Sequence, residues 1–351
     1  MTFTVGYMIG SLSAASINRI LARALVRLAP PEWSMVEIPI KDLPLYNRDL
    51  DGDYPPEARA LKDAIANGQV GREPPAWGRS QMLVTSGRAR LAYEITGIHS
   101  GADVLLIHAA VSDRRSWQHV VARLASRHRC IAYDARGFGT TAYEPEEGWS
   151  TVADAVAVLD AAGVERAIVV GSSNGGQTAL DLALAHPNRV AGLVLIGTAI
   201  RGAPYPDAEE GPTAELYPMI ESAESAGDID EVNRLEAWMW LDGPAVDEGR
   251  VVGPARDLFL DMNGKALRAG STGKQAEIPP AWPRLGEVTA PTLMLIGRLD
   301  VEDIRAVNEL AAEIIPKAHL VWLNGVAHLP HLEGDPATLD EIADFVDAAL
   351  A

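Results

Sequence analysis

The sequence predicts an α/β fold built around a mostly parallel central sheet. From about residue 80 onward, short apolar runs alternate regularly with helical patterns, as in sheets that helices cover on both faces. The chain has 351 residues, of which 48% are hydrophobic, and this suits one large domain with an additional segment. No apolar run approaches the ~20 residues of a membrane span, so we expect a soluble protein with no membrane contact.

Each predicted element follows from its local pattern. Strands are expected where β-branched and other apolar residues run together, at 81–86, 90–95, 103–108, 128–133, 166–170, 191–197, 291–297 and 318–323. Helices are expected where apolar residues recur at helical spacing, at 116–126, 151–162, 175–186, 303–315 and 337–350. The last helix has an apolar face opposite acidic residues, so it should pack on the sheet and close the domain.

The alternation stops between residues 200 and 288, where turns precede irregular helices rich in Trp, Met and acidic residues. This stretch separates the strand ending at Gly197 from the strand starting at Pro291. We interpret it as an inserted helical lid over the carboxyl edge of the sheet, where ligands bind in open α/β folds. Within it, Trp238, Met239 and Trp240 are either part of the lid core or the wall of an apolar pocket.

The first 70 residues form a separate predicted unit. TFTVGYMIG and SMVEIPI have strand patterns, whereas SINRILARALVRLA and PPEARALKDAIANG have helical ones. Residues 71–80, GREPPAWGRS, are rich in Pro and Gly and are predicted to be a linker. A larger domain is expected over residues 81–351.

Charge and cysteine content exclude several classes of function. The formal net charge is −18 without clusters of Lys and Arg, so we do not expect nucleic-acid binding. Cys130 is the single cysteine and lacks neighbours for a disulfide or a metal site, so it should pack in the core. No metal ligand set is recognised. The N-terminus lacks the basic start of a secretory signal, and a cytoplasmic location is expected.

The pattern G-x-S-x-G occurs in GSSNGG, residues 171–176, between the strand-like AIVV and a helical pattern. Such a turn strains the backbone of its central residue, Ser173, and glycines at the flanking positions let strand and helix approach closely. Ser173 would present its oxygen at the positive end of a helix dipole, beside the backbone N–H of Asn174. This context favours a nucleophilic serine. The alternative is a serine in an ordinary strand-to-helix turn.

A nucleophilic serine requires a histidine to take its proton and an acid to orient that histidine. Asp300 follows a buried strand, and His328 lies in the loop after another strand. All three candidates lie just past the carboxyl ends of strands, in the order serine, aspartate, histidine. We therefore predict Ser173, Asp300 and His328 as catalytic residues.

Three neighbours are alternatives at these positions. Glu302 and Asp303 lie where a helical pattern begins, and an acid there ordinarily caps the helix. His331 could face the same pocket as His328, but PHLEGDP is more typical of the approach to the final helix. For the oxyanion hole, the loop carrying His108, Ala109 and Ala110 offers a second backbone N–H, and Ala110 is our candidate beside Asn174. The alternative is a plain strand-to-helix connection.

Together these motifs resemble the α/β-hydrolase superfamily over residues 80–351. The matching segments are IHAAVSDRRSW, YDARGFGTT, GSSNGG, IGRLDVED and GVAHLPHLE, in that order. The chain is similar to lidded esterases and lactonases such as 3-oxoadipate enol-lactonases, and to C–C hydrolases of aromatic ring-cleavage pathways. The family most often has Gly where Ala109 stands. Haloalkane dehalogenases and epoxide hydrolases match less well, because their elbow nucleophile is Asp.

The segment YDARGFGTT is expected to support the site structurally. Asp134, Arg136, Gly137 and Gly139 are predicted to form a tight loop with an internal ion pair that braces the site. A direct catalytic role is the alternative.

The N-terminal unit resembles the first part of the NADPH-dependent FMN reductases, which have a flavodoxin-like fold. The likeness lies in GSLSAASINRILARALVRLAP, IKDLPLYNRDLD and PPEARALKDAIANG. It implies that Ser11, Ser16 and Asn18 would bind a flavin phosphate at a helix N-terminus. The likeness stops near residue 68, so we interpret the unit as a truncated appendage without a working flavin site.

The sequence thus predicts a cofactor-free serine hydrolase of a small carboxylic ester or lactone, acting through an acyl-enzyme on Ser173. A second hypothesis keeps the same three residues and cleaves a carbon–carbon bond of an aromatic ring-cleavage product. A third, from another class, is flavin binding or FMN reduction by the N-terminal unit.

Overall fold

A computed structural model describes residues 3–7, 26, 33–37, 81–99, 101–205 and 211–349. The chain divides into two compact units, Met1–Ala76 and Trp77–Ala351. In the first unit, β1 (Phe3–Tyr7) and β2 (Trp33–Glu37) pair in parallel.

Several predictions for this first unit fall outside the described residues. They are the flavin-phosphate candidates Ser11, Ser16 and Asn18, the predicted linker 71–80, and, apart from Val26, the two helices.

The second unit contains a nine-stranded sheet in the order β11-β10-β9-β8-β5-β6-β4-β3, with β7 paired to β4. Its strands are β3 (Met82–Ser86), β4 (Ala89–Gly97), β5 (Asp103–Ile107), β6 (Arg129–Tyr133), β7 (Ala142–Tyr143), β8 (Ala167–Ser172), β9 (Val190–Ile196), β10 (Thr292–Gly297) and β11 (Ala318–Leu323). β5, β6, β8, β9, β10 and β11 pair in parallel, whereas β3, β4 and β7 pair antiparallel. The prediction of a mostly parallel sheet is confirmed.

Helices cover both faces of this sheet. They are α3 (Gln118–Leu124), α4 (Thr151–Ala161), α5 (Asn174–Ala185), α9 (Glu302–Ile314), α10 (Pro330–Glu333) and α11 (Pro336–Ala348), with 3-10 turns at η2 (Arg114–Trp117), η3 (Pro187–Arg189) and η5 (Trp282–Glu287).

Successive residues of a buried strand point to opposite faces of a sheet, and β5 shows the consequence. Leu105 and Ile107 belong to the apolar cluster of α4, α5 and α9. Val104 and Leu106 belong to the cluster of α3 and α11. Because both faces are covered, the central strands are apolar throughout, and their carboxyl ends are left to carry polar chemistry.

Cys130 lies in β6 and is almost completely buried, as predicted. Burial raises the pKa of its thiol to about 12. The thiol is therefore a packing group and not a reactive thiolate.

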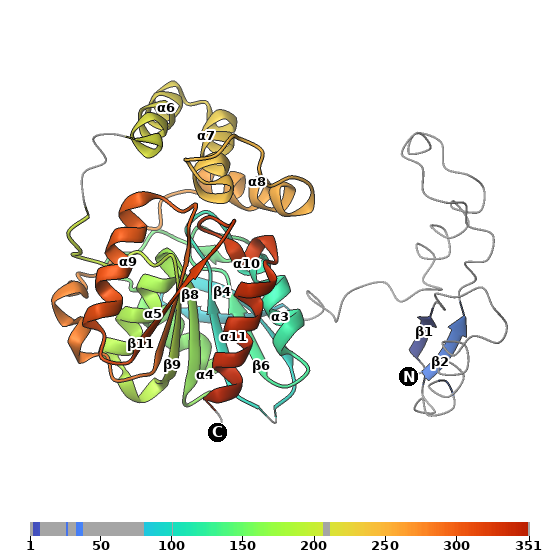
Figure 1. Ribbon diagram of the computed structural model, residues 1–351. Helices are drawn as coiled ribbons and strands as arrows, with labels where there is room; N and C mark the ends of the chain where they lie inside the picture. Colours follow the sequence, from blue (N-terminus) through green and yellow to red (C-terminus); the bar gives the residue numbers. More distant parts are fainter. Residues whose placement is uncertain are drawn as a thin grey trace, which may run out of the picture. The chain divides into compact units, whose positions relative to one another are not determined.

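A helical segment is inserted between β9 and β10. It consists of α6 (Pro212–Ala226), α7 (Ile229–Glu236), the π-helix η4 (Ala237–Asp242) and α8 (Pro254–Leu267). Figure 1 shows α6, α7 and α8 grouped at one end of the sheet. Leu241 and Phe259 pack with Ala109 and Leu329, so this segment contacts the loops that follow β5 and β11.

Candidate active site

Ser173 occupies the turn between β8 and α5. Its backbone has φ 53° and ψ −119°, and no other non-glycine residue in the described part of the chain has a positive φ. A Cβ atom on Gly171 would overlap the carbonyl oxygen of Gly175, and one on Gly175 would overlap that of Ile107. Glycine is therefore required on both sides of the strained turn, and Ser173 stands at the start of α5.

His328 and Asp300 lie against each other in the loops that follow β11 and β10. Nδ1 of His328 is 2.9 Å from both carboxylate oxygens of Asp300, and both side chains are buried. Asp300 also accepts the backbone N–H of Val301 at 2.8 Å, which holds the carboxylate in place. With Nδ1 directed at a carboxylate, the imidazole keeps Nε2 for proton transfer.

The end of β9 adjoins both Ser173 and the Asp300–His328 pair. The N–H of Ser173 donates to the carbonyl oxygen of Ile196, the last residue of β9, at 2.9 Å. Gly197 follows with φ 48°, and a Cβ atom on it would lie 2.9 Å from Oδ2 of Asp300 and from Nδ1 of His328. The strained turn and the Asp300–His328 pair therefore adjoin consecutive residues of the same strand end.

Trp240 of the inserted segment lies beside His328, with the two ring centroids 4.8 Å apart. Arg250 joins η4 to Gly325, in the loop after β11, and to Glu333, at the end of α10. Its guanidinium donates to both carboxylate oxygens of Glu333 at 2.8 Å and to the carbonyl oxygen of Asp242 at 2.7 Å. The insertion thus supplies an aromatic neighbour to the imidazole.

The other two residues of this aromatic stretch have structural roles. Met239 is fully buried in the core of the insertion. Nε1 of Trp238 donates to the carbonyl oxygen of Val246 at 2.8 Å. The interpretation as lid core therefore fits Trp238 and Met239, and Trp240 packs on a loop of the sheet domain.

The alternative acids are committed elsewhere. α9 begins after Val301, so Glu302 and Asp303 lie in its first turn and are not caps. Asp303 accepts the N–H of Ile304 at 2.7 Å, and Glu302 accepts the hydroxyl of Thr213 in α6.

The alternative histidine is completely buried. His331 stacks on the indole of Trp117 with ring centroids 4.2 Å apart. Neither ring nitrogen has a hydrogen-bond partner among the described residues. Burial lowers the pKa of His331 to about 3, so it is neutral at physiological pH.

Ala110 and Asn174 lie on adjoining loops, after β5 and at the first turn of α5. Neither backbone N–H donates to another atom of the described chain. His108 braces the first loop: its Nε2 accepts the N–H of Ala135 at 3.0 Å, so Nδ1 carries the proton and donates to the carbonyl oxygen of Ala109 at 2.8 Å. Two unpaired donors are therefore available where these loops meet.

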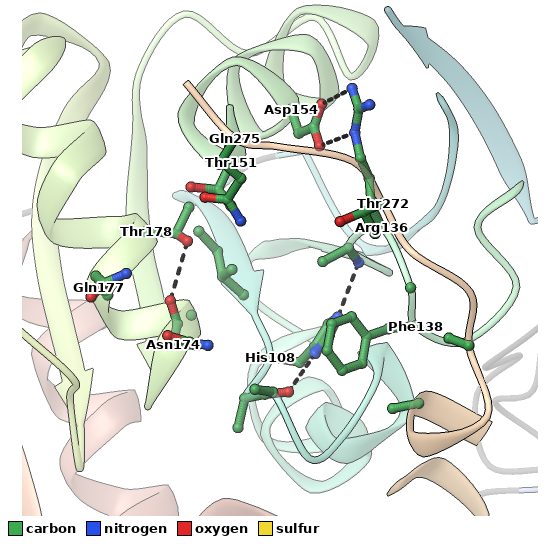
Figure 2. Close-up of a pocket in the computed structure, with 18 of the residues that line it drawn as sticks. His108, Arg136, Phe138, Thr151, Asp154, Asn174, Gln177, Thr178, Thr272 and Gln275 are labelled. Atoms are coloured by element: carbon green, nitrogen blue, oxygen red, sulfur yellow. Dashed lines mark hydrogen bonds and ion pairs between the residues drawn. The ribbon is translucent and has the colours of Figure 1, made fainter. Parts of the chain in front are cut away.

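A cavity of about 530 Å³ opens beside Ala110 and Asn174. Its walls come from the loops after β5, β6, β8 and β9, the start of α4 and the end of the insertion. The lining residues are Ile107, His108, Ala109, Ala110, Tyr133, Ala135, Arg136, Gly137, Phe138, Trp149, Thr151, Asp154, Asn174, Gly175, Gln177, Thr178, Arg201, Ala266, Ala269, Gly270, Ser271, Thr272 and Gln275. Figure 2 shows Thr151 and Gln275 together on one side of the cavity, apart from His108 and Phe138.

Sequence reasoning did not single out Trp149, Thr151, Arg201 or Gln275. These residues belong to no motif, and they come from segments that only the folded chain brings together. Only Arg201 carried a weak signal, because it lies shortly after the predicted strand 191–197, and ligand-binding loops collect at such strand ends in this type of sheet.

The loop after β6 supports the site differently from the prediction. Asp134 and Arg136 do not pair with each other. Asp134 pairs with Arg114, and Arg136 pairs with Asp154, with Nε and Nη2 at 2.9 and 3.0 Å from its oxygens (Figure 2). The predicted internal ion pair is wrong, because η2 and α4 bring partners that are distant in sequence. Glu146 provides a second carboxylate to Arg136, at 2.6 Å.

The loop itself is tight, as predicted. Gly137 and Gly139 have φ of 89° and 52°, and a Cβ atom on Gly139 would overlap the carboxylate of Asp134. Side chains other than hydrogen would displace that carboxylate from Arg114.

Neither a metal centre nor a membrane anchor is found in the described ranges. No three His, Cys, Asp or Glu side chains there are grouped so as to hold a metal ion. No helix among the same residues has the length and apolar content to cross a membrane.

The chain is similar to known hydrolases. A 2-hydroxymuconate semialdehyde hydrolase of Pseudomonas sp. is 38% identical over 133 residues, which are 35% of this chain and 46% of that enzyme. A pimeloyl-[acyl-carrier protein] methyl ester esterase of Aliivibrio salmonicida is 26% identical over 251 residues, 70% of this chain and 92% of the esterase.

Among solved structures, a hydrolase from Pseudomonas aeruginosa matches with a TM-score of 0.62 and 28% identity, over 77% of this chain and 99% of that one. The model of the alpha/beta hydrolase family matches residues 104–342, which is more than half of the chain. The chain therefore belongs to the alpha/beta hydrolase family and is a hydrolytic enzyme.

Proposed function

We propose that this hydrolase cleaves a small carboxylic ester or lactone through an acyl-enzyme on Ser173. His328 is the general base and Asp300 orients it. The observation that carries the proposal is the buried Asp300–His328 contact of 2.9 Å, which adjoins the same strand end as the strained Ser173. A serine at a helix start beside a carboxylate-held imidazole is the arrangement that activates a hydroxyl for acyl transfer.

In the first half of the reaction, Nε2 of His328 takes the hydroxyl proton of Ser173 while Oγ attacks the carbonyl carbon. The carbonyl oxygen becomes an oxyanion, to which the N–H groups of Ala110 and Asn174 donate. The bond between the carbonyl carbon and the alkoxy oxygen then breaks, and His328 returns the proton to that oxygen. The alcohol of an ester leaves, whereas the new hydroxyl of a lactone stays on the acyl chain, and in both cases the acyl group remains on Ser173.

In the second half, His328 takes a proton from water, and the oxygen of that water attacks the acyl carbon. The bond to Oγ breaks, and Ser173 regains its proton from His328. An ester yields an acid and an alcohol, whereas a lactone yields one hydroxy acid. The balance consumes one water molecule and requires no cofactor.

The inserted helices are proposed to act as a lid over this chemistry. Trp240 restricts one side of the His328 imidazole, and Arg250 keeps η4 beside the loop that carries it. The end of the insertion also lines the cavity, so the segment contributes to substrate selection.

The relatives support the proposal in two directions. One is a methyl ester esterase, and the match to this chain covers 92% of that esterase. This relative favours ester hydrolysis. The other, the 2-hydroxymuconate semialdehyde hydrolase, favours a second candidate function, carbon–carbon cleavage of a ring-cleavage product. In that case the same residues would act, and the proton would go to the leaving carbon instead of an alkoxy oxygen.

The nucleophile is tested by fluorophosphonate labelling and peptide mapping of the full chain. Ser172 is a matched control, because it neighbours Ser173 and its Oγ is buried. We expect Ser173→Ala to lose the label and to lower p-nitrophenyl acetate turnover by on the order of 10⁴-fold or more. Ser172→Ala should be labelled at Ser173. A label at another residue, or turnover retained in Ser173→Ala, would contradict the proposal.

A substrate panel separates the two candidate bonds. Short acyl esters and lactones are assayed beside 2-hydroxymuconate semialdehyde, whose colour is lost on cleavage. Faster turnover of the esters and lactones supports the first candidate. Faster loss of the colour would replace it with the second.

A further inference from the structure

The side-chain amide of Asn308 joins two segments of the chain that meet at the proposed site. Asn308 lies in α9, which begins at Glu302, two residues after Asp300. Its Oδ1 accepts the N–H of Thr198 at 3.1 Å, and its Nδ2 donates to the carbonyl oxygens of Thr198 and Ile304, each at 2.8 Å. Asn308 is completely buried, so water does not compete for these three bonds.

Residues 196–199, to which Thr198 belongs, hold the backbone of Ser173 from both sides. The N–H of Ser173 donates to the carbonyl oxygen of Ile196 at 2.9 Å, and its carbonyl oxygen accepts the N–H of Ala199 at 3.2 Å. A strained backbone such as that of Ser173 persists only where its surroundings determine it. The segment 196–199 therefore determines where the strained turn lies.

The same segment touches the acid and the histidine through Gly197. A Cβ atom on Gly197 would lie 2.9 Å from Oδ2 of Asp300 and from Nδ1 of His328. The N–H of Gly197 still donates to β10, at 3.0 Å. One residue later this support ends: among the residues that the structure describes, the N–H and the carbonyl oxygen of Thr198 bond only to Asn308.

We propose that Asn308 is a positioning residue, which fixes where Ser173 lies relative to the Asp300–His328 pair. The bond from Nδ2 to the backbone of α9 anchors the amide in the helix that follows the acid. The two bonds to the segment 196–199 anchor the backbone that holds the serine. The inference rests on the proposed function, because proton transfer from the serine requires the imidazole within hydrogen-bond reach.

The test variants are Asn308→Leu and Asn308→Asp, which keep the approximate size of the side chain in the full-length protein. Leucine makes none of the three bonds, whereas aspartate can only accept, so it keeps the bond from the N–H of Thr198 and loses the other two. We expect both variants to lower kcat for p-nitrophenyl acetate by on the order of 10²-fold, the cost of a displacement of about 1 Å. KM should change by less than about threefold, because Asn308 does not line the cavity.

Fluorophosphonate labelling separates positioning from misfolding, because it reports both how many sites react and how fast they react. If Asn308 positions the site, the rate constant for labelling Ser173 falls by about the same factor as kcat, and labelling still reaches full occupancy. If Asn308 serves only the stability of the fold, the unfolded fraction of the protein stays unlabelled, and the folded fraction reacts at the wild-type rate.

The matched control is His128→Leu. His128 is also buried, and it also pairs with other elements: its Nδ1 accepts the N–H of Ala102 at 3.2 Å, and its Nε2 donates to Asp347 at 2.8 Å. It lies just before β6, at the edge of the sheet where the parallel strands begin, whereas the proposed catalytic residues follow strand ends. This variant should label at the wild-type rate, and urea unfolding compares its loss of stability with that of the Asn308 variants.

Slower labelling at full occupancy in an Asn308 variant, with the wild-type rate in His128→Leu, supports the proposal. Wild-type rates in the Asn308 variants, or an equal slowing in His128→Leu, would overturn the proposal and leave the proposed function intact. A wild-type chain that is neither labelled at Ser173 nor active on esters would overturn the proposed function itself, and the positioning role with it.

Discussion

Nδ1 of His328 lies 2.9 Å from each carboxylate oxygen of Asp300, and both side chains are buried. The two residues come from loops after neighbouring parallel strands, β11 and β10. A charge buried in this way requires a partner, and the imidazole provides one. The contact orients the ring and, under the proposed function, stabilises the imidazolium that forms when Ser173 loses its proton.

Asp300→Asn is expected to lower kcat for p-nitrophenyl acetate by on the order of 10³- to 10⁴-fold, because the amide favours the wrong imidazole tautomer. The fold should persist, since the side-chain oxygen can still accept the N–H of Val301. Asp303→Asn, in the first turn of α9 directly after that loop, is the control and should keep near wild-type turnover. Comparable losses in the two variants would show that the loop, and not the carboxylate contact, limits activity.

Gly197→Ala is expected to disturb the site directly. Its Cβ atom would lie 2.9 Å from both Asp300 and His328, in a backbone of φ 48°. Displacing the imidazole should lower kcat/KM by on the order of 10²-fold. The control is Gly163→Ala, which has φ 67° but no atom within 4 Å of the new Cβ.

Both glycine variants share the cost of alanine in a left-handed conformation, about 1–2 kcal/mol of unfolding free energy. Urea unfolding measures that shared cost in stability, and steady-state kinetics measures how far the kcat/KM values of the two variants differ. Equal activities in the two variants would contradict the proposed placement of His328 at Gly197.

His331 is expected to make stability depend on pH. Its pKa is lowered to about 3, first by burial and then by the nearby His328, His119 and His108. The unfolded chain has the ordinary pKa of 6.5, so between these values it binds more protons than the folded chain. The free energy of unfolding therefore falls as the pH drops through 6.5, and His331 accounts for a loss of about 2 kcal/mol by pH 5.

His331→Leu should remove this part of the pH dependence and keep most of the volume stacked on Trp117. The measurement is urea unfolding at pH 7 and pH 5 for the wild type, His331→Leu and His319→Gln, which removes an exposed histidine. Only His331→Leu should reduce the loss in the free energy of unfolding between pH 7 and pH 5. If His331→Leu leaves this loss unchanged, His331 takes up its proton by pH 5 in the folded chain as it does in the unfolded chain.

Arg136→Gln is expected to destabilise the fold by about 3–5 kcal/mol, because it leaves the buried Asp154 carboxylate without its cation. It also removes the bond from Nη2 to the carbonyl oxygen of Ser86. Arg123→Gln breaks an exposed pair with Asp340 and should cost less than about 1 kcal/mol. Chemical unfolding of both variants checks the contrast. Similar midpoints would show that the Asp154 pair adds no more than a surface pair.

Much of the sheet domain was predictable because its signals are local. The strand at 103–108 is observed as β5, Asp103–Ile107, and the helix at 151–162 as α4, Thr151–Ala161, since apolar periodicity marks each of them. The two-residue strand β7 and the short helix α10 were missed, because elements of this length carry no periodic pattern.

The amino-acid sequence by itself determined the α/β class, the turn that strains Ser173 and the strand ends at which Asp300 and His328 stand. These features depend on neighbours within a few residues of each position. Tertiary structure alone decided that Arg136 pairs with Asp154 instead of Asp134, and that Trp149, Thr151 and Arg201 line one cavity. Such contacts depend on the order of strands in the sheet and on how helices pack over it, because packing joins residues that no local pattern relates.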